Sequence, residues 1–365
     1  RSTDMEVLEN AFFLCETGGD VRAVDFDRSP TAKFSENLFV QNTTGVQAEP
    51  GKQAFDRAST TGDTTSAAGN KNNNNNNHTA NANVAEAPAE EQRPLLQSRF
   101  LHLFRNNFMG CDRGVRITDV SCFIDRNRVL ASTNEGLLVE GRAGAYSHIL
   151  QNNFAYNKVG IGFRNRMAVS HLEGGRVLNN KVGILIEKCD SKIIIESTRV
   201  LLNDIGVNVL NCNETVSDSS AMDNNLGAYA GRLISLPSTS SITNRARLYH
   251  NNDGPYLIQL QVEKNRTGVR ANDSRVQLRS CCITGLGRGA VADGPHSIGV
   301  SADNGSSVRI YGFEQTQSTD IKSVLRKFID TNNFGRYAIG QCAVGLQVCM
   351  ATIYLRNSFV VDNVL

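Results

Sequence analysis

The chain has 365 residues, of which 40% are hydrophobic and 20% charged, a composition typical of a soluble globular or solenoid protein. Its formal net charge of +2 gives no sign of a nucleic-acid or membrane-surface footprint. No apolar run approaches the roughly 18 residues that a membrane-spanning helix requires. We therefore expect neither a nucleic-acid nor a membrane partner.

The first residues predict a short helix. Thr3-x-x-Glu6 is a capping-box pattern that precedes an apolar run, and such a helix would cover the exposed edge of any sheet that follows. The sequence begins at Arg1 without a secretory hydrophobic segment, which weakly favours a cytoplasmic location. Nine cysteines without C-x-x-C spacing are interpreted as small buried side chains in a reducing compartment.

Residues 39–48 read FVQNTTGVQA, and the spacing of Asn42, Gly45, Val46 and Ala48 matches the repeat described below, which predicts one coil here. Residues 49–98 follow as a low-complexity segment that contains six consecutive asparagines at 72–77. This segment has too few large apolar residues to bury a core, so we expect a disordered insertion in one turn of a single domain spanning 1–365. The strand pattern resumes at residues 100–104, FLHLF.

From residue 114 onward the sequence repeats with a period of about 23 residues, within the range of known repeat architectures. Three clear copies are FAYNKVGIGF at 154–163, VLNNKVGILI at 177–186 and VLLNDIGVNV at 200–209. The glycines that align are Gly114, Gly136, Gly160, Gly183, Gly206, Gly227 and Gly254, then Gly299 and Gly345 at double steps, which makes ten steps in all. Three residues before the glycine stand Asn157, Asn180, Asn203, Asn224 and Asn251.

A repeat of this length predicts a solenoid. Leucine-rich repeats need a regular leucine pattern that these units lack, and helical repeats need longer units. Three short strands per unit, joined by turns, fit best. Each asparagine is then expected at a turn, where its amide can bond the equivalent asparagine one coil away, about 4.8 Å along the axis. Each glycine is expected to mark a tight turn or a positive φ.

The repeated Asn-x-x-Gly-[Ile/Val/Leu]-x-[Ile/Val/Phe] pattern, best seen over residues 157–229, resembles the right-handed parallel β-helix repeat family. This is the superfamily of pectate lyases, polygalacturonases and many non-enzymatic relatives. The resemblance covers about residues 20–365 apart from the insertion, and it implies an all-β, right-handed parallel β-helix of about a dozen coils. It is specific for fold and weak for function, because the repeat itself is structural.

Enzymes of this superfamily usually act on one outer face of the β-helix. Their signatures would be Asn-Thr-Asp with a following Asp-Asp, Gly-His-Gly and Arg-Ile-Lys, or Arg-x-Pro-x-x-Arg with clustered calcium-binding aspartates, and none occurs here. The sequence also lacks tryptophan, the usual platform for sugar stacking. We therefore favour a non-catalytic scaffold or protein-interaction module from the non-enzymatic branch, with a protein partner.

The alternative is a polysaccharide lyase, a glycosidase or a carbohydrate-binding module. Register within the third strand of each coil places three rows on its outer face, namely Val169, Lys192 and Thr215; His171, Ile194 and Ser217; Glu173, Glu196 and Ser219. Glu173 and Glu196 would lie about 5 Å apart on adjacent coils and could divide the nucleophile and acid roles, with His171 and Lys192 as binding or tuning residues. The competing interpretation is a solvated charged face.

No cofactor and no metal site is expected. Cys189 and Cys212 are separated by one period of the repeat and are predicted to stack on neighbouring coils as a buried thiol pair. Cys281 and Cys282 are adjacent and lack the spacing of metal ligands.

Overall fold

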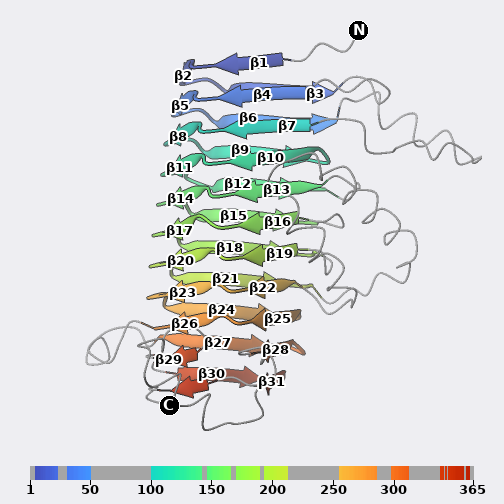
Figure 1. The fold of residues 1–365 in the computed structure, drawn as a ribbon, viewed down its shortest axis with the longest axis vertical. Helices are drawn as coiled ribbons and strands as arrows, with labels where there is room; N and C mark the ends of the chain where they lie inside the picture. Colours follow the sequence, from blue (N-terminus) through green and yellow to red (C-terminus); the bar gives the residue numbers. More distant parts are fainter. Residues whose placement is uncertain are drawn as a thin grey trace, which may run out of the picture.

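A computed structural model of the chain describes residues 5–23, 31–50, 100–141, 146–165, 170–189, 193–212, 255–285, 297–311, 338–340, 342, 344–356 and 359–361. Successive coils stack along one axis from the N-terminal to the C-terminal end (Figure 1). Each coil gives one strand to each of three parallel sheets, so neighbours within a sheet are three strands apart in sequence. This topology fits the predicted right-handed parallel β-helix, with eleven coils in the described part of the chain.

The three sheets are named here A, B and C. Sheet A contains β1 (Met5–Leu8), β4 (Thr31–Ser35), β7 (Phe100–Phe104), β10 (Ser121–Asp125), β13 (Ser147–Leu150), β16 (Ser170–Glu173), β19 (Ile193–Glu196), β22 (Tyr256–Ile258), β25 (Arg275–Arg279), β28 (Ser307–Tyr311) and β31 (Thr352–Arg356). Sheet B contains β2 (Ala11–Phe13), β5 (Leu38–Val40), β8 (Asn107–Met109), β11 (Arg128–Leu130), β14 (Asn153–Ala155), β17 (Arg176–Leu178), β20 (Arg199–Leu201), β23 (Gln261–Glu263), β26 (Cys282–Thr284), β29 (Ala338–Gly340) and β32 (Phe359–Val361). Sheet C contains β3 (Thr17–Ala23), β6 (Thr44–Pro50), β9 (Arg113–Thr118), β12 (Glu135–Glu140), β15 (Val159–Arg164), β18 (Val182–Glu187), β21 (Ile205–Leu210), β24 (Thr267–Asn272), β27 (Ile298–Asp303) and β30 (Val344–Cys349).

The predicted N-terminal helix is wrong, because β1 and β2 occupy that stretch as the first strands of the β-helix. Stacking on the next coil outweighs the local capping pattern: the Phe12 ring lies parallel to that of Phe39, with 4.8 Å between centroids. Among the described residues there is no helix, and hence none that could span a membrane.

The predicted insertion falls almost wholly on residues 51–99, which lie outside the described residues. Its start was placed two residues early, because β6 extends to Pro50. The strands on either side belong to consecutive coils, since β4 pairs with β7 and β6 with β9.

The core is a set of columns of like side chains. The middle residue of each three-residue strand in sheet B points inward, and these residues stack from coil to coil. Phe39 stacks on Phe108 with 4.6 Å between ring centroids, and Val129 and Phe154 continue the column. All four are at most 1% exposed. Burial of one apolar side chain per strand per coil is the main stabilising contribution to such a solenoid.

The corners of the coil are tight. Most are turned by one residue in the left-handed region, such as Tyr156 (φ 60°), Asn179 (φ 53°) and Leu202 (φ 55°) between sheets B and C. A single residue is enough to change the direction of the chain at such a corner, so the side chain of the next residue points into the interior. If that side chain is polar, it needs a hydrogen-bond partner there.

The predicted asparagine ladder is confirmed at this corner. The backbone N–H and the Nδ2 of Asn157 both donate to Asn180 Oδ1, at 2.8 and 3.1 Å. Asn180 donates in the same way to Asn203, and Asn203 to Asn265. Each Nδ2 also donates to a strand carbonyl of the preceding coil, such as that of Phe154 from Asn180. Each amide interior to the ladder therefore uses both its donors and its acceptor.

A second ladder lies between sheets A and B and was not predicted. Asn37, Asn106, Asn127 and Asn152 are bonded in series, with Nδ2 to Oδ1 distances of 3.0 Å. Its sequence signal is an asparagine eight or nine residues before the coil's glycine, a second fixed offset in the same repeat.

The predicted frame after Gly206 is wrong. β21 pairs directly with β24, so Gly268 follows Gly206 in the stack, and Asn265 takes the position expected of Asn224. Gly227, Gly254, Asn224 and Asn251 lie outside the described residues. The glycines from Gly114 to Gly345 therefore form seven steps rather than ten.

The glycines of the repeat do not have the positive φ that was expected of them. They lie inside sheet C, where neighbouring backbones approach closely. A Cβ on Gly160 would stand 2.6 Å from the carbonyl oxygen of Gly183 and 2.8 Å from Val177 Cγ1. Glycine is required here because no other residue leaves room for the next coil.

The cysteines agree with the expected buried pair. Cys189 and Cys212 stack as buried thiols without a disulfide between them, and the Cys189 N–H donates to Cys212 Sγ at 3.4 Å.

Replacing Asn180 with alanine should lower the free energy of unfolding by about 2–4 kcal/mol, because it removes the acceptor used by two buried N–H groups of Asn157. The matched control is Asn179→Gly, at the position next to Asn180. Glycine adopts the left-handed φ of residue 179 without strain, so the free energy of unfolding should change by less than about 0.5 kcal/mol. Urea unfolding of both variants measures the difference; equal losses would show that the ladder is not the cause.

A second matched pair lies within β15. Gly160→Ala should cost about 2 kcal/mol or more, because its Cβ would collide with the Gly183 backbone, which cannot move aside. Gly162→Ala meets Leu138 Cδ1 at 3.4 Å, the end of a flexible side chain, and should be tolerated within about 1 kcal/mol. Thermal unfolding of the two variants, which differ only in the position of one methyl group, tests the close-approach explanation.

Candidate acid–base site on sheet A

The outer face of sheet A has two rows of side chains that matter for chemistry. One row passes through His102, Phe123, His148 and His171 on β7, β10, β13 and β16. The second row lies two residues further along each strand and contains Asp125, Leu150, Glu173 and Glu196. Period-two alternation puts both rows on the same face, opposite the buried Leu103, Ile124, Ile149 and Leu172.

The predicted register within the site is confirmed for two pairs. His171 stands beside Ile194, and Glu173 beside Glu196. The continuation was wrong, because β19 pairs with β22, so Tyr256 and Ile258 follow in the two rows in place of Ser217 and Ser219. Those two serines lie outside the described residues, as do Val169, Thr215 and the predicted binding residue Lys192.

The histidines form a stack with the aromatic side chains of the row. The rings of His148 and His171 are parallel within 3°, with centroids 5.3 Å apart. Phe123 meets His148 edge to face at 5.3 Å and His102 in the same way at 5.1 Å. His148 is 1% exposed and His171 4% exposed. The interpretation of this face as solvated is therefore wrong.

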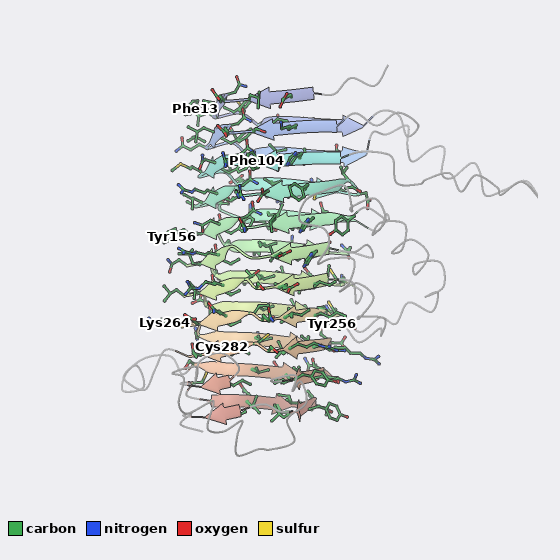
Figure 2. All side chains as sticks on the ribbon, in the orientation of Figure 1. Phe13, Phe104, Tyr156, Tyr256, Lys264 and Cys282 are labelled. Carbon is green, nitrogen blue, oxygen red and sulfur yellow. The ribbon has the colours of Figure 1, made fainter. Side chains whose placement is uncertain are left out.

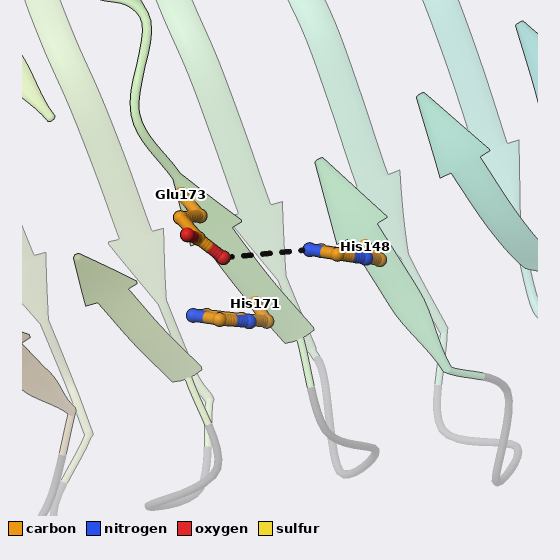
Figure 3. Close-up of side chains that lie close together, drawn as sticks. All are labelled: His148, His171 and Glu173. Atoms are coloured by element: carbon orange, nitrogen blue, oxygen red, sulfur yellow. Dashed lines mark ion pairs between the residues drawn. The ribbon is translucent and has the colours of Figure 1, made fainter. Parts of the chain in front are cut away.

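The two glutamates each turn toward a histidine of the preceding coil. Glu173 Oε2 lies 3.9 Å from His148 Nε2, and Glu196 Oε2 lies 3.6 Å from His171 Nε2. Figure 3 shows the first pair and the neighbouring His171 ring from the same side. The Glu173 side chain is 31% exposed and that of Glu196 is 3% exposed. Of these four side chains, Glu173 is the one that reaches solvent.

Burial governs the proton affinity of the row. It lowers the pKa of His148, while the nearby Glu173 carboxylate acts in the opposite direction. His102 has its pKa lowered by burial first and by Lys33 second. At the other end of the site, burial raises the pKa of Asp125 against the opposing influence of Arg126, His148 and Arg105. A neutral imidazole beside a carboxylate is a unit that can accept and relay a proton.

His148, His171 and Glu173 are also of the right types to hold a metal ion, and their donor atoms lie within 4.8 Å of one another. A tetrahedral zinc site with bonds of about 2.0–2.1 Å brings its donor atoms much closer together and makes them converge. The parallel histidine rings instead carry their nitrogens side by side. The parallel rings therefore make the cluster a candidate for acid–base chemistry.

Another charged cluster lies on the outer face of sheet C and has a structural character. Arg113 and Arg164 each contact Glu135 at 2.7 Å, and Arg164 also contacts Glu187 at 3.2 Å. Every charge in this chain of ion pairs is neutralised by its neighbours. The sheet A site differs because each of its two glutamates lies beside an imidazole ring.

The sequence has no match among models of protein families, and a search of curated proteins found none either. Solved structures with a similar fold are two crystal structures of the periplasmic alginate epimerase AlgG. A single-substitution variant superposes with a TM-score of 0.50 at 11% sequence identity, covering 98% of this chain and 71% of that one. A double-substitution variant gives 0.49 at 10% identity, with coverage of 98% and 70%. At such identities the first likeness supports the parallel β-helix fold alone.

The lowered pKa of His148 predicts acid sensitivity. Below about pH 6.5 the unfolded chain binds a proton that the folded protein resists, so stability should be constant above this pH and decrease below it. The groups facing His148 are His171, Glu173, Asp125 and Tyr146. We expect His148→Gln to make the decrease shallower in urea unfolding between pH 5 and 8.

An NMR titration measures the same pKa directly. His148 should titrate below its ordinary value of 6.5, and Glu173→Gln should lower its pKa further, because the carboxylate favours the charged imidazole. A His148 pKa at or above 6.5 would contradict the dominant role of burial.

Proposed function

We propose that the protein acts on a linear polysaccharide along the outer face of sheet A, with acid–base chemistry at Glu173 supported by His148. The observation that carries this proposal is the staggered pairing of buried histidines with glutamates on consecutive coils. This favours the carbohydrate-active alternative over the non-catalytic scaffold and over a protein partner.

The energetic cost of the cluster argues for a function. Removing ionisable groups from water costs free energy unless they are well paired, and an apolar face of the same shape would be cheaper. Neither His148 nitrogen has a hydrogen-bond partner within the part of the chain that the structure describes. A face that merely docks a partner has no need of such groups, whereas perturbed titratable side chains concentrate at sites of catalysis.

The geometry also distinguishes between the two enzyme classes. A retaining glycosidase uses two carboxyl groups about 5–5.5 Å apart that face each other across the scissile bond. Here Glu173 and Glu196 are register partners, yet each carboxylate is directed at a histidine. Pairs of this kind suit the transfer of a proton, which favours a lyase over a glycosidase.

Glu173 is the candidate catalytic residue because it is the most exposed of the four side chains. In an elimination on a uronate residue, its carboxylate would take the proton from C5, and the electron pair would form the C4–C5 double bond. The C4–O bond then breaks, and the leaving oxygen takes a proton from water. His148, on the preceding coil, lies beside the Glu173 carboxylate and acts as a positioning residue. Glu196 and His171 form a second, buried pair.

The fold similarity supports the same class. The periplasmic alginate epimerase with a TM-score of 0.50 is a carbohydrate-modifying enzyme built on a β-helix. Its residues are not transferred to this chain, because the sequence identity is 11%. The proposal rests on the sheet A cluster, and the likeness adds that this architecture accommodates polysaccharide chemistry.

The test is a panel of acidic and neutral polysaccharides, with and without calcium, in which binding and the release of unsaturated sugars are both measured. Glu173→Gln should lower turnover by about 100-fold or more. His148→Gln should lower kcat more than it raises KM and should shift the pH profile. The matched control is His102→Gln, which lies in the same row two coils away and should leave turnover within about twofold.

The outcomes separate the candidate functions. Turnover that survives Glu173→Gln would remove this residue from the chemistry. Saturable binding without turnover would overturn the catalytic part and identify a carbohydrate-binding module. Absence of both binding and turnover on every polysaccharide would contradict the proposal and return the scaffold interpretation to first place.

A further inference from the structure

A different face of the β-helix carries a regular pattern of positive charge. The three-residue strands of sheet B place their first residue on the outside, and in the central coils these residues are Arg128, Asn153, Arg176 and Arg199. The three arginines are exposed, and Asn153 is half-buried between two of them. Adjacent coils repeat about every 4.8 Å, so the row follows the axis as a line of guanidinium groups. We call it the arginine row.

A strip of apolar side chains lies beside the arginine row. The third residue of each of the same strands also points outward, and in chain order these residues are Leu130, Ala155, Leu178 and Leu201. In two of these coils the corner residue that follows is also apolar and exposed, namely Tyr156 (64% exposed) and Leu202 (48% exposed). Figure 2 shows Tyr156 and Lys264 at the same edge of the β-helix as Phe13.

Lysines close the other side of the strip. Lys158 and Lys181 follow the ladder residues Asn157 and Asn180, and both are exposed. They occupy neighbouring coils, since the Lys181 N–H donates to the carbonyl of Asn157. The surface is therefore an apolar strip, with one exposed aromatic ring, between a line of arginines and a pair of lysines.

Most of these charges are not used within the fold. Among the residues that the structure describes, no carboxylate lies within ion-pair distance of Arg128, Arg176, Lys158 or Lys181, and Arg199 approaches Glu263 at 3.9 Å. By contrast, Arg113, Arg116 and Arg164 of sheet C are each held at 2.7 Å by a glutamate. Unpaired like charges side by side are unfavourable, so their persistence in a row points to an anionic ligand.

We infer that the arginine row and the strip beside it bind a linear acidic polysaccharide, which lies parallel to the axis of the β-helix. Its carboxylate or sulfate groups would be held by the guanidinium groups and by the two lysines, because arginine matches planar anions with paired N–H donors. The apolar faces of its sugar rings would cover the leucines and Tyr156. A repeating polymer suits a surface whose chemistry itself repeats from coil to coil.

An acidic polysaccharide fits this surface better than a nucleic acid. Single-stranded nucleic acids are bound by successive aromatic side chains on which the bases stack, and the strip offers one aromatic ring amid leucines. The site lies on sheet B rather than sheet A and is detected through binding alone. The two proposals are separated by their variants: affinity lost on substitution of the sheet B arginines tests this site, whereas turnover lost in Glu173→Gln tests the sheet A site.

The experiment measures binding of the full chain to polygalacturonate by titration calorimetry at low and at moderate salt. Dextran serves as the neutral polymer and oligothymidylate as the nucleic acid. The test variant is the triple substitution Arg128→Gln, Arg176→Gln and Arg199→Gln. The matched control is Lys188→Gln, Arg116→Gln and Arg270→Gln, which removes the same charge from sheet C and from the residue that follows β18, outside the strands of sheets A and B.

We expect the wild-type chain to bind polygalacturonate with an affinity that falls as salt rises, and dextran at least tenfold more weakly. The sheet B triple variant should lose affinity about tenfold or more, while the control changes it less than threefold. Replacing the three arginines with lysine keeps the charge but removes the paired N–H donors, so it should restore only part of the affinity. Thermal unfolding of both triple variants at the wild-type temperature excludes misfolding as the cause. Absence of binding, equal losses in both triple variants, or tighter binding of dextran or oligothymidylate would each overturn the inference.

Discussion

The whole architecture depends on how closely one coil can approach the next. Sheet C brings the backbones of Gly160 and Gly183 so near that a single methyl group would not fit between them. The corner beside them delivers an asparagine to the interior, and its amide bonds the next coil at the spacing set by that approach. The glycines thus allow the backbones of neighbouring coils to approach, and the asparagines fix the register between those coils. The columns of buried phenylalanine, valine and isoleucine depend on both.

This strict register gives the outer faces their chemistry. Residues that recur at the same position in successive coils lie in straight rows, so a histidine or an arginine that appears twice in the sequence at the coil period becomes a pair in space. Sheet A uses this to stack His148 on His171 and to set a glutamate against each. Sheet B uses it to align charges that are separated by a full coil in sequence. The two faces have different compositions but obtain their geometry from the same interior.

The sequence was sufficient to predict the fold and the register wherever the period is constant. Between residues 154 and 209 the glycine and asparagine offsets do not vary, and the ladder and the pairing of Glu173 with Glu196 were predicted there. The frame failed after residue 212 because a constant period was imposed on a chain that departs from it. Gly268 has Asn265 three residues before it and the small apolar residues Val269 and Ala271 after it, whereas Gly254 is followed by a proline. The role of His148 was missed, although it precedes His171 by one period. Spacing alone does not reveal the direction of a side chain, and this direction decides which histidine each glutamate faces.

The sequence distance between bonded ladder residues also has consequences for how the chain folds. Asn157 reaches its partner after 23 residues, whereas Asn203 reaches its partner after 62 and Asn37 after 69. Closing a loop of 62 rather than 23 residues costs about 0.9 kcal/mol more in chain entropy. We therefore expect the coils from Asn106 to Asn203, whose bonded ladder residues within that stretch are nearest in sequence, to form first. The coils on either side can add to this preformed template, so the same stacking that builds the faces also sets an order of assembly from the centre outward.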